Sequence, residues 1–211
     1  MKQFKTKKAA LSVAVSLSNP SKMPSFSYGL PALEACPVGR KLAKVPGSTC
    51  GDCYACKGMY QFKNVKKSQR DRMSATQRAD WVPAMVKLIT GQKFFRWHDS
   101  GDLYSMEYLR KVLAVCAATP DTLHWIPTRE KGLLARFIKS GGHIPENVTI
   151  RLSAAMVDEP AASLPGIPTS TVHHNRPAIG HECPAPTQAG ECRDCRACWD
   201  KSIVNVSYNK H

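Results

Sequence analysis

The chain has 211 residues, 43% of them hydrophobic, so it can bury one substantial core, and we expect a single domain over residues 1–211. Thirty lysines and arginines oppose sixteen aspartates and glutamates, and the net charge of +14 makes nucleic acid a candidate partner; a basic surface that serves only solubility is the alternative. No apolar run is long enough to cross a membrane, and nine cysteines without a clear secretory signal indicate reduced thiols in a cytoplasmic protein, not a disulfide scaffold.

The N-terminal third is predicted to hold one strand and two helices around a cysteine-rich region. A short strand is expected over about residues 9–17, an apolar stretch interrupted by serines, and the cysteine-rich region follows at residues 20–60. The densest basic run, residues 57–78, fits a helix with a solvated basic face. A second helix is predicted from Asp80, as its N-cap, to about Ile89.

The middle of the chain, residues 93–175, alternates between strand and helix patterns. We predict strands at residues 94–98, 123–126, 148–152 and 169–173, and helices over about residues 105–117 and 133–138. Cys116 lies on the buried stripe of the first of these helices and is predicted to be a core residue. Repeated β-α units predict an α/β fold with a mainly parallel sheet, closed or partly closed as a distorted (β/α) barrel.

Eight of the nine cysteines form two quartets of the same design, the second in a C-terminal segment at residues 181–211. Each quartet has a lone Cys-Pro followed by a triplet with two residues between successive cysteines. The triplets, Cys-Gly-Asp-Cys-Tyr-Ala-Cys and Cys-Arg-Asp-Cys-Arg-Ala-Cys, share Asp and Ala at the same offsets. The first quartet is Cys36, Cys50, Cys53 and Cys56, and the second is Cys183, Cys192, Cys195 and Cys198. The repeat predicts two similar metal sites.

The spacing within the triplets favours iron–sulfur clusters. A structural zinc site commonly takes two Cys-x2-Cys pairs on separate loops, whereas a cubane offers several iron corners to one wrapping loop. We therefore expect two clusters of the [4Fe–4S] type, with structural zinc and redox thiols as the alternatives. Cys36 and Cys183 are the expected fourth ligands, and which of the two serves which triplet stays open. Because both quartets have the same order, four-thiolate, closed sites are the simplest expectation.

Polar residues gather at four successive strand ends, where α/β folds place their sites. Each has a structural reading as well: Asp102 as a helix N-cap, Arg129 with Glu130 as a surface pair, and His173 as an edge residue. Taken together they predict a pocket for a small-molecule substrate or cofactor, although no known nucleophile motif identifies a reaction. The pocket candidates are His98, Asp99, Asp102, Thr128, Arg129, Glu130, Arg151, Ser153 and His173.

Four segments resemble a known family. They are the run from Cys53 to Tyr60, Trp97-His-Asp-Ser-Gly-Asp-Leu103, Trp125-Ile-Pro-Thr-Arg-Glu130 and Cys192-Arg-Asp-Cys-Arg-Ala-Cys-Trp199. In these segments the chain resembles the bacteriophage gene product 88 family over about residues 20–211. The resemblance implies a phage-encoded protein in the host cell more than it implies a reaction.

A weaker resemblance is to radical S-adenosylmethionine enzymes, which are partial β/α barrels with an early cluster-binding loop. Ser100-Gly-Asp-Leu103 occupies a place comparable to the Gly-Gly-Glu-Pro segment of those enzymes. This resemblance implies adenosylmethionine bound at an open iron. The spacing of the first triplet is two and two, where that family has three and two, and Tyr54 follows the middle cysteine.

Three functional hypotheses follow. The first is an iron–sulfur protein similar to radical enzymes, with its first cluster at the barrel mouth. The second is a non-catalytic, basic nucleic-acid-binding module that metal sites staple together. The third is electron transfer between the clusters, which requires the two quartets to meet in space.

Overall fold

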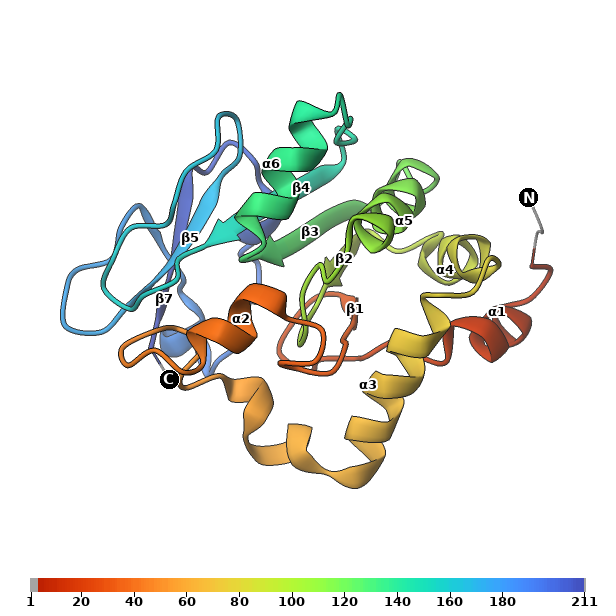
Figure 1. The fold of residues 1–211 in the computed structure, drawn as a ribbon, viewed down its shortest axis with the longest axis horizontal. Coiled ribbons are helices and arrows are strands. Elements are labelled where there is room, and N and C mark those ends of the chain that lie inside the picture. The colour runs from red at the N-terminus through yellow and green to blue at the C-terminus, as the bar shows by residue number, and fades with distance from the viewer. Residues whose placement is uncertain (1–3, 211) are drawn as a thin grey trace.

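The computed structural model describes residues 4–210 and is built around one open sheet of seven strands, all paired in parallel (Figure 1). Residues 1–3 and 211 of the expected single domain lie outside the described part. The strand order is β1-β2-β3-β4-β5-β7-β6, and five neighbouring strands in chain order are typical of a (β/α) barrel that does not close. The predicted α/β fold with a partial barrel is confirmed. The strands are β1 (Phe26–Tyr28), β2 (Phe94–Trp97), β3 (Leu123–Thr128), β4 (Val148–Ser153), β5 (Thr169–His173), β6 (His181–Glu182) and β7 (Asn205–Asn209).

Four of the helices lie in one of two places relative to the sheet (Figure 1). Helices α4, α5 and α6 lie along the sheet, whereas α2 and the cysteine-rich loop after it lie at the end where the strands finish. The α-helices are α1 (Lys7–Ala14), α2 (Pro37–Leu42), α3 (Lys63–Ala75), α4 (Trp81–Ile89), α5 (Met106–Ala117) and α6 (Lys131–Lys139). Short 3-10 turns are η1 (Tyr54–Cys56), η2 (Gly58–Gln61), η3 (Ala185–Gln188) and η4 (Ala197–Trp199).

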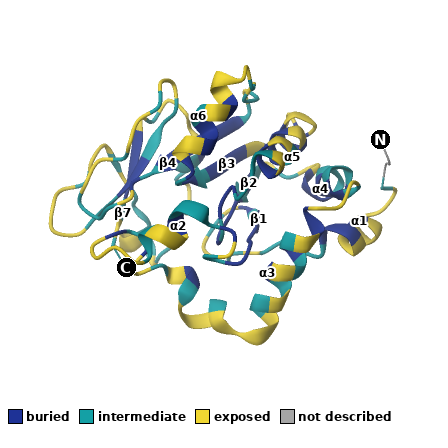
Figure 2. Cartoon of the chain, in the orientation of Figure 1, coloured by how far each residue is buried: buried dark blue, intermediate teal, exposed yellow. Residues whose placement is uncertain are grey.

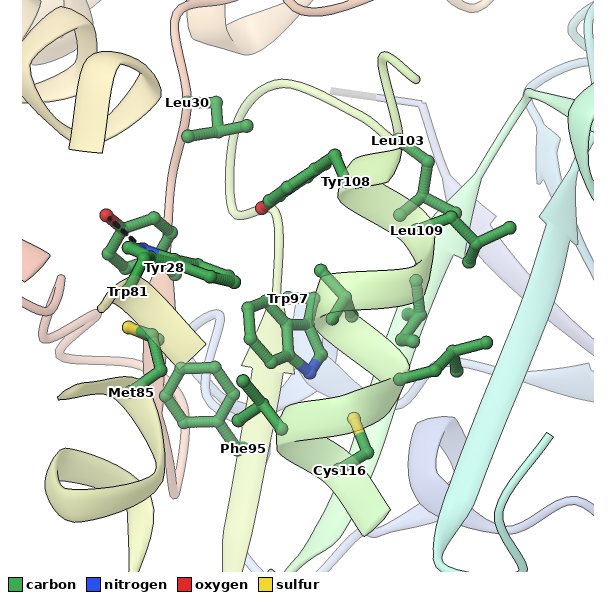
Figure 3. Close-up of a cluster of buried hydrophobic side chains, with 14 of the residues drawn as sticks. Tyr28, Leu30, Trp81, Met85, Phe95, Trp97, Leu103, Tyr108, Leu109 and Cys116 are labelled. Carbon is green, nitrogen blue, oxygen red and sulfur yellow. Dashed lines mark hydrogen bonds between the residues drawn. The ribbon is translucent and has the colours of Figure 1, made fainter. Parts of the chain in front are cut away.

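The strands and parts of helices α4 to α6 are the buried parts of the chain (Figure 2). Aromatic side chains fill the core between the sheet and these helices (Figure 3). Trp81 of α4 donates a hydrogen bond from its indole nitrogen to the hydroxyl of Tyr28 at 3.1 Å, so a polar atom of each ring is satisfied inside the core. Trp97 of β2 lies beside both rings. Cys116 is fully buried on α5, as predicted.

The first predicted strand, over residues 9–17, is wrong. Most of this stretch belongs to helix α1, whose Thr6 side chain accepts a hydrogen bond from the backbone of Ala9 at 3.1 Å and so caps the helix. Ala10, Val13 and Ala14 repeat at helical spacing and are buried. Serines that interrupt an apolar run break a strand face, but here Ser12 falls on the exposed side of the helix and Ser16 follows its end.

The remaining predicted elements are present. The four predicted strands are β2 to β5, and the predicted helices correspond to α3, α4, α5 and α6. Asp80 does precede α4, but its carboxylate makes no capping hydrogen bond and instead accepts from Arg78. In α5 the cap is Ser105, whose hydroxyl accepts from the Tyr108 backbone at 3.1 Å, so Asp102 is not the cap of this helix.

Candidate functional site

The first cysteine quartet is assembled by the loop after β1. Cys36 directly precedes α2, and the backbone of Cys53 donates to Cys50 at 3.3 Å while that of Cys56 donates to Cys53 at 2.9 Å, so the triplet winds in successive turns. Gly39 of α2 lies against two of the cysteines. A Cβ atom there would lie 3.0 Å from the Cys36 Cβ and 3.4 Å from the Cys50 sulfur. Cys36 therefore belongs with the first triplet, and Gly39 keeps the space beside the thiols free.

The surroundings of this quartet disfavour the thiolate form of Cys36 and Cys50, which a bound cation would stabilise. Burial, together with the negative charges of Asp102, Cys53 and Cys50, raises the pKa of Cys36 to about 12. Burial also raises the pKa of Cys50, partly offset by the positive charge of Arg129. Without a compensating cation these thiols stay protonated, whereas a bound metal would deprotonate them. The donor set fits a metal or an iron–sulfur cluster.

The second quartet repeats this local design beside strands β6 and β7. The backbone of Cys195 donates to Cys192 at 2.9 Å, and Cys198 lies in η4 just as Cys56 lies in η1. Cys183 follows β6 and donates from its backbone to Ser207 of β7 at 2.8 Å. The pKa of Cys192 is raised by burial and then by the charges of Cys183 and Cys195, which places Cys183 beside the second triplet.

Arg151 holds this second triplet in place. Its side chain is fully buried and donates to five backbone carbonyls, three of them in or beside η4. The bonds run to Ala197 at 2.7 Å, Cys198 at 3.1 Å, Asp200 at 2.6 Å, Ile203 at 2.9 Å and Thr169 at 3.2 Å. Every donor of the guanidinium group is used inside the protein. Arg151 does not line the pocket that its position in the sequence predicted.

Between residues 4 and 210, no three or more His, Cys, Asp or Glu side chains are grouped closely enough to hold a single metal ion.

A cavity of about 230 Å³ opens at the carboxyl ends of the strands, beside the first quartet. Cys36, Cys50 and Cys53 line it. Five of the predicted pocket residues line it as well, namely His98, Asp102, Thr128, Arg129 and Ser153. Arg96, Tyr54 and Tyr208 also line the cavity and were not predicted.

The other predicted residues position elements around the cavity. Glu130 is buried and accepts a hydrogen bond from the backbone of Val38 at 2.7 Å, which fixes the start of α2 and with it Cys36, so Glu130 is not half of a surface pair. Burial raises the pKa of Glu130. Asp99, just after the end of β2, accepts a hydrogen bond from the hydroxyl of Ser27 in β1 at 2.6 Å. His173 lies towards the sheet edge, where its Nδ1 atom is 2.8 Å from the Ser207 hydroxyl.

Asp102 joins the cysteine loop to the end of β3. Its carboxylate accepts from the Thr128 hydroxyl at 2.6 Å and from the Arg129 backbone at 2.9 Å, and its own backbone N–H donates to Ala35 at 3.0 Å. Desolvation raises the pKa of Asp102, against these hydrogen bonds. The residue therefore sets where Arg129 enters the cavity.

Arg96 and Tyr208 connect the cavity to the second quartet. Arg96 donates to the hydroxyl of Tyr54, within the first triplet, at 3.1 Å. Burial raises the pKa of Cys192 and Cys198 in the second triplet, and the charge of Arg96 partly offsets that rise. The hydroxyl of Tyr208 is 3.1 Å from the Cys198 sulfur. Lys210 also pairs with Asp52 at 3.4 Å, so the chain's end lies at the first loop (Figure 1). Arg96 and Tyr208 thus link the cavity to the second triplet, but no cysteine of the second quartet is among the described residues that line it, so the meeting of the quartets that electron transfer requires stays a prediction.

His98 occupies a strained position at the end of β2. Its φ of 58° lies in the left-handed region, which a residue with a side chain adopts at a cost and most often at functional sites. The side chain is 3% exposed, and burial, with the nearby charge of Arg96, lowers its pKa to about 3. The imidazole is therefore neutral at physiological pH.

This lowered pKa predicts an acid-sensitive fold. An unfolded histidine titrates near 6.5, so between about pH 6.5 and pH 3 the unfolded state binds a proton that the folded state excludes. His98 should reduce the free energy of unfolding by about 1.4 kcal/mol per pH unit in that window. Urea unfolding at several pH values measures the slope, which His98→Asn should flatten, because asparagine tolerates left-handed backbone. The exposed His143→Gln is the control; equal slopes in wild type and His98→Asn would contradict this account.

The basic helix predicted from the sequence is present as α3, but its charges are partly engaged. Lys67 pairs with Asp71 at 2.6 Å and Arg70 with Glu34 at 2.7 Å, both on the surface. Arg72 is buried and donates to the backbone of Ser16 at 2.9 Å.

Fold and site together define an α/β protein of the partial-barrel type, with two cysteine quartets and, at the carboxyl edge of its sheet, a polar cavity beside the first of them. The chain belongs to the gene product 88 family, whose model matches residues 1–201. This confirms the family resemblance and supports a bacteriophage origin. No match was found among curated proteins or among solved structures.

None of the helices in residues 4–210 is long and apolar enough to cross a membrane.

Proposed function

We propose that this protein binds two iron–sulfur clusters, one at each cysteine quartet, and that the first cluster works beside a bound small molecule. The observation that carries the proposal is the shared cavity, because three thiols of the first quartet line it together with Asp102, Thr128 and Arg129. Strand ends of a parallel sheet are where α/β proteins bind ligands. A metal site with a purely structural role has no need of such a cavity.

The chain's own residues would hold and shield the first cluster. Cys36, Cys50, Cys53 and Cys56 are its ligands in this proposal, and Glu130 orients Cys36 through the start of α2. When bound, an iron–sulfur cluster supplies one-electron chemistry whose potential is set by burial and by hydrogen bonds to its sulfurs. The neutral, buried thiols show how strongly the surroundings disfavour negative charge, which Arg129 offsets beside Cys50.

The position of Cys36 bears on adenosylmethionine. Because Gly39 packs against both Cys36 and Cys50, we infer that Cys36 is the fourth ligand of the first cluster and that the site is closed. A closed site leaves no iron free to chelate adenosylmethionine, so the small molecule would bind next to the cluster and exchange electrons with it.

The experiment is metal analysis and electron paramagnetic resonance of anaerobically purified protein. We expect absorption near about 400 nm, about eight irons with matching sulfide per chain, and a reduced-cluster signal that adenosylmethionine leaves unchanged. A signal shifted by adenosylmethionine, with cleavage products, would overturn the closed site and favour radical chemistry. A colourless protein with stoichiometric zinc and salt-sensitive nucleic-acid binding would favour the metal-stapled binding module instead.

A further inference from the structure

Two residues that line the cavity, one in β2 and one directly after it, each have a buried polar atom without a hydrogen-bond partner. In the part of the chain that the structure describes, Nε of Arg96 and Nδ1 of His98 are buried without a hydrogen bond, and both residues line the cavity. Arg96 lies in β2 and His98 directly after its end, where the positive φ of His98 breaks the alternation of the strand, so what the two residues share is the cavity that both line. A buried polar atom left unpaired costs about 1–3 kcal/mol, and unpaired atoms that gather in a cavity indicate a missing polar ligand.

Arg129 offers free guanidinium donors in the same cavity, where its charge also acts on Asp102 and Cys50. Its Nε donates to the Thr49 hydroxyl at 3.0 Å, which anchors the group, while its two terminal nitrogens make no hydrogen bond or ion pair within residues 4–210. The acidic residues that line the cavity are engaged elsewhere. Both oxygens of Asp102 accept hydrogen bonds, and Asp52 pairs with Lys57 at 3.1 Å and with Lys210 at 3.4 Å.

We propose that the cavity binds a small carboxylate, held by the two terminal nitrogens of Arg129, with Arg96 and His98 as its further polar contacts. A planar guanidinium group with two parallel donors matches a carboxylate. The single positive charge of Arg129, which Asp102 partly offsets, suits one negative charge better than the nearly two charges of a phosphate group. A cavity of about 230 Å³ is below the size that encloses drug-sized ligands, so the ligand is small.

This inference names the ligand of the proposed function and rests on it only for the cluster as one wall of the cavity. The ligand's carboxylate would lie beside Cys50, whose pKa Arg129 already influences. The neutral imidazole of His98 can either donate or accept at Nδ1, because its other nitrogen is 3.1 Å from the Tyr108 hydroxyl, which can take either role.

The test is protection of Arg129 from phenylglyoxal in the anaerobically purified protein, followed by peptide mass spectrometry. The probes are acetate, succinate, L-methionine and adenosylmethionine, with acetamide, succinamide and inorganic phosphate as comparisons at constant ionic strength. We expect at least one carboxylate, at ten times its Kd, to slow the modification of Arg129 about tenfold, as mass action requires. The modification of Arg110, an exposed arginine of α5, should not change.

The outcomes separate this inference from the proposed function. No protection by any carboxylate, or protection by phosphate alone, would overturn the carboxylate site even if iron is present. Protection in a protein without iron would overturn the cluster and leave the site standing. Arg129→Gln should abolish the rise in Tm that the protecting carboxylate causes, whereas Arg110→Gln should keep it.

Discussion

Replacing Arg151 with alanine is expected to lower the free energy of unfolding by at least about 3 kcal/mol, one of the largest effects of any single change in this protein. The guanidinium group donates to five backbone carbonyls and is fully buried, so its removal leaves several buried acceptors unpaired. Each such acceptor costs about 1 kcal/mol or more. Urea unfolding of the anaerobic protein measures the loss.

The same substitution should also affect the two metal sites unequally. Three of the carbonyls belong to Ala197, Cys198 and Asp200, so the second quartet loses its shape while the first keeps Glu130 and Asp102. Arg151→Lys should recover part of the stability, because lysine keeps the charge and up to three donors. Arg176→Ala, which removes an exposed pair with Glu159, is the control and should stay within about 0.5 kcal/mol of wild type. A control-like stability for Arg151→Ala would show that the five contacts do not hold the segment.

Cys53→Ala and Cys195→Ala should each remove about half of the iron, because each takes one thiolate from a different quartet. The two losses should be independent, and the double variant should lose nearly all iron. Cys116→Ser is the matched control, since it also replaces a cysteine but lies in the core on α5, outside both quartets. Iron content unchanged in both single variants would contradict the assignment of ligands, and complete loss in either would mean one shared site.

Much of the central fold could be predicted because its pattern is local. Strands β2 to β5 are rich in aromatic and β-branched residues, and α5 and α6 show apolar residues at helical spacing. The short edge strands β1 and β6, and strand β7 between β5 and β6, exist through their pairing with other strands, which no local pattern encodes. Residues 9–17 were misread because an apolar stretch of that length fits a strand or a helix, and the cap at Thr6 decides it.

The site was predictable in its location but not in the role of each residue. Arg129 and Arg151 look alike in the sequence, since each lies at or near a strand end. Only the return of the C-terminal segment, with the carbonyls of η4, makes Arg151 a structural residue. Arg96 was missed although an arginine between Phe95 and Trp97 is itself a signal, because a charge in a strand next to buried rings needs a partner.

The most direct test of the two clusters is X-ray diffraction at the iron absorption edge from anaerobically grown crystals. The proposal predicts two separate iron peaks, one surrounded by Cys36 and the triplet of Cys50, Cys53 and Cys56, and the other by Cys183 and the second triplet. The first should lie at the carboxyl edge of the sheet, and Arg96 and Tyr208 should lie between the two peaks. Peaks at the zinc edge in place of iron, or iron at neither quartet, would contradict it.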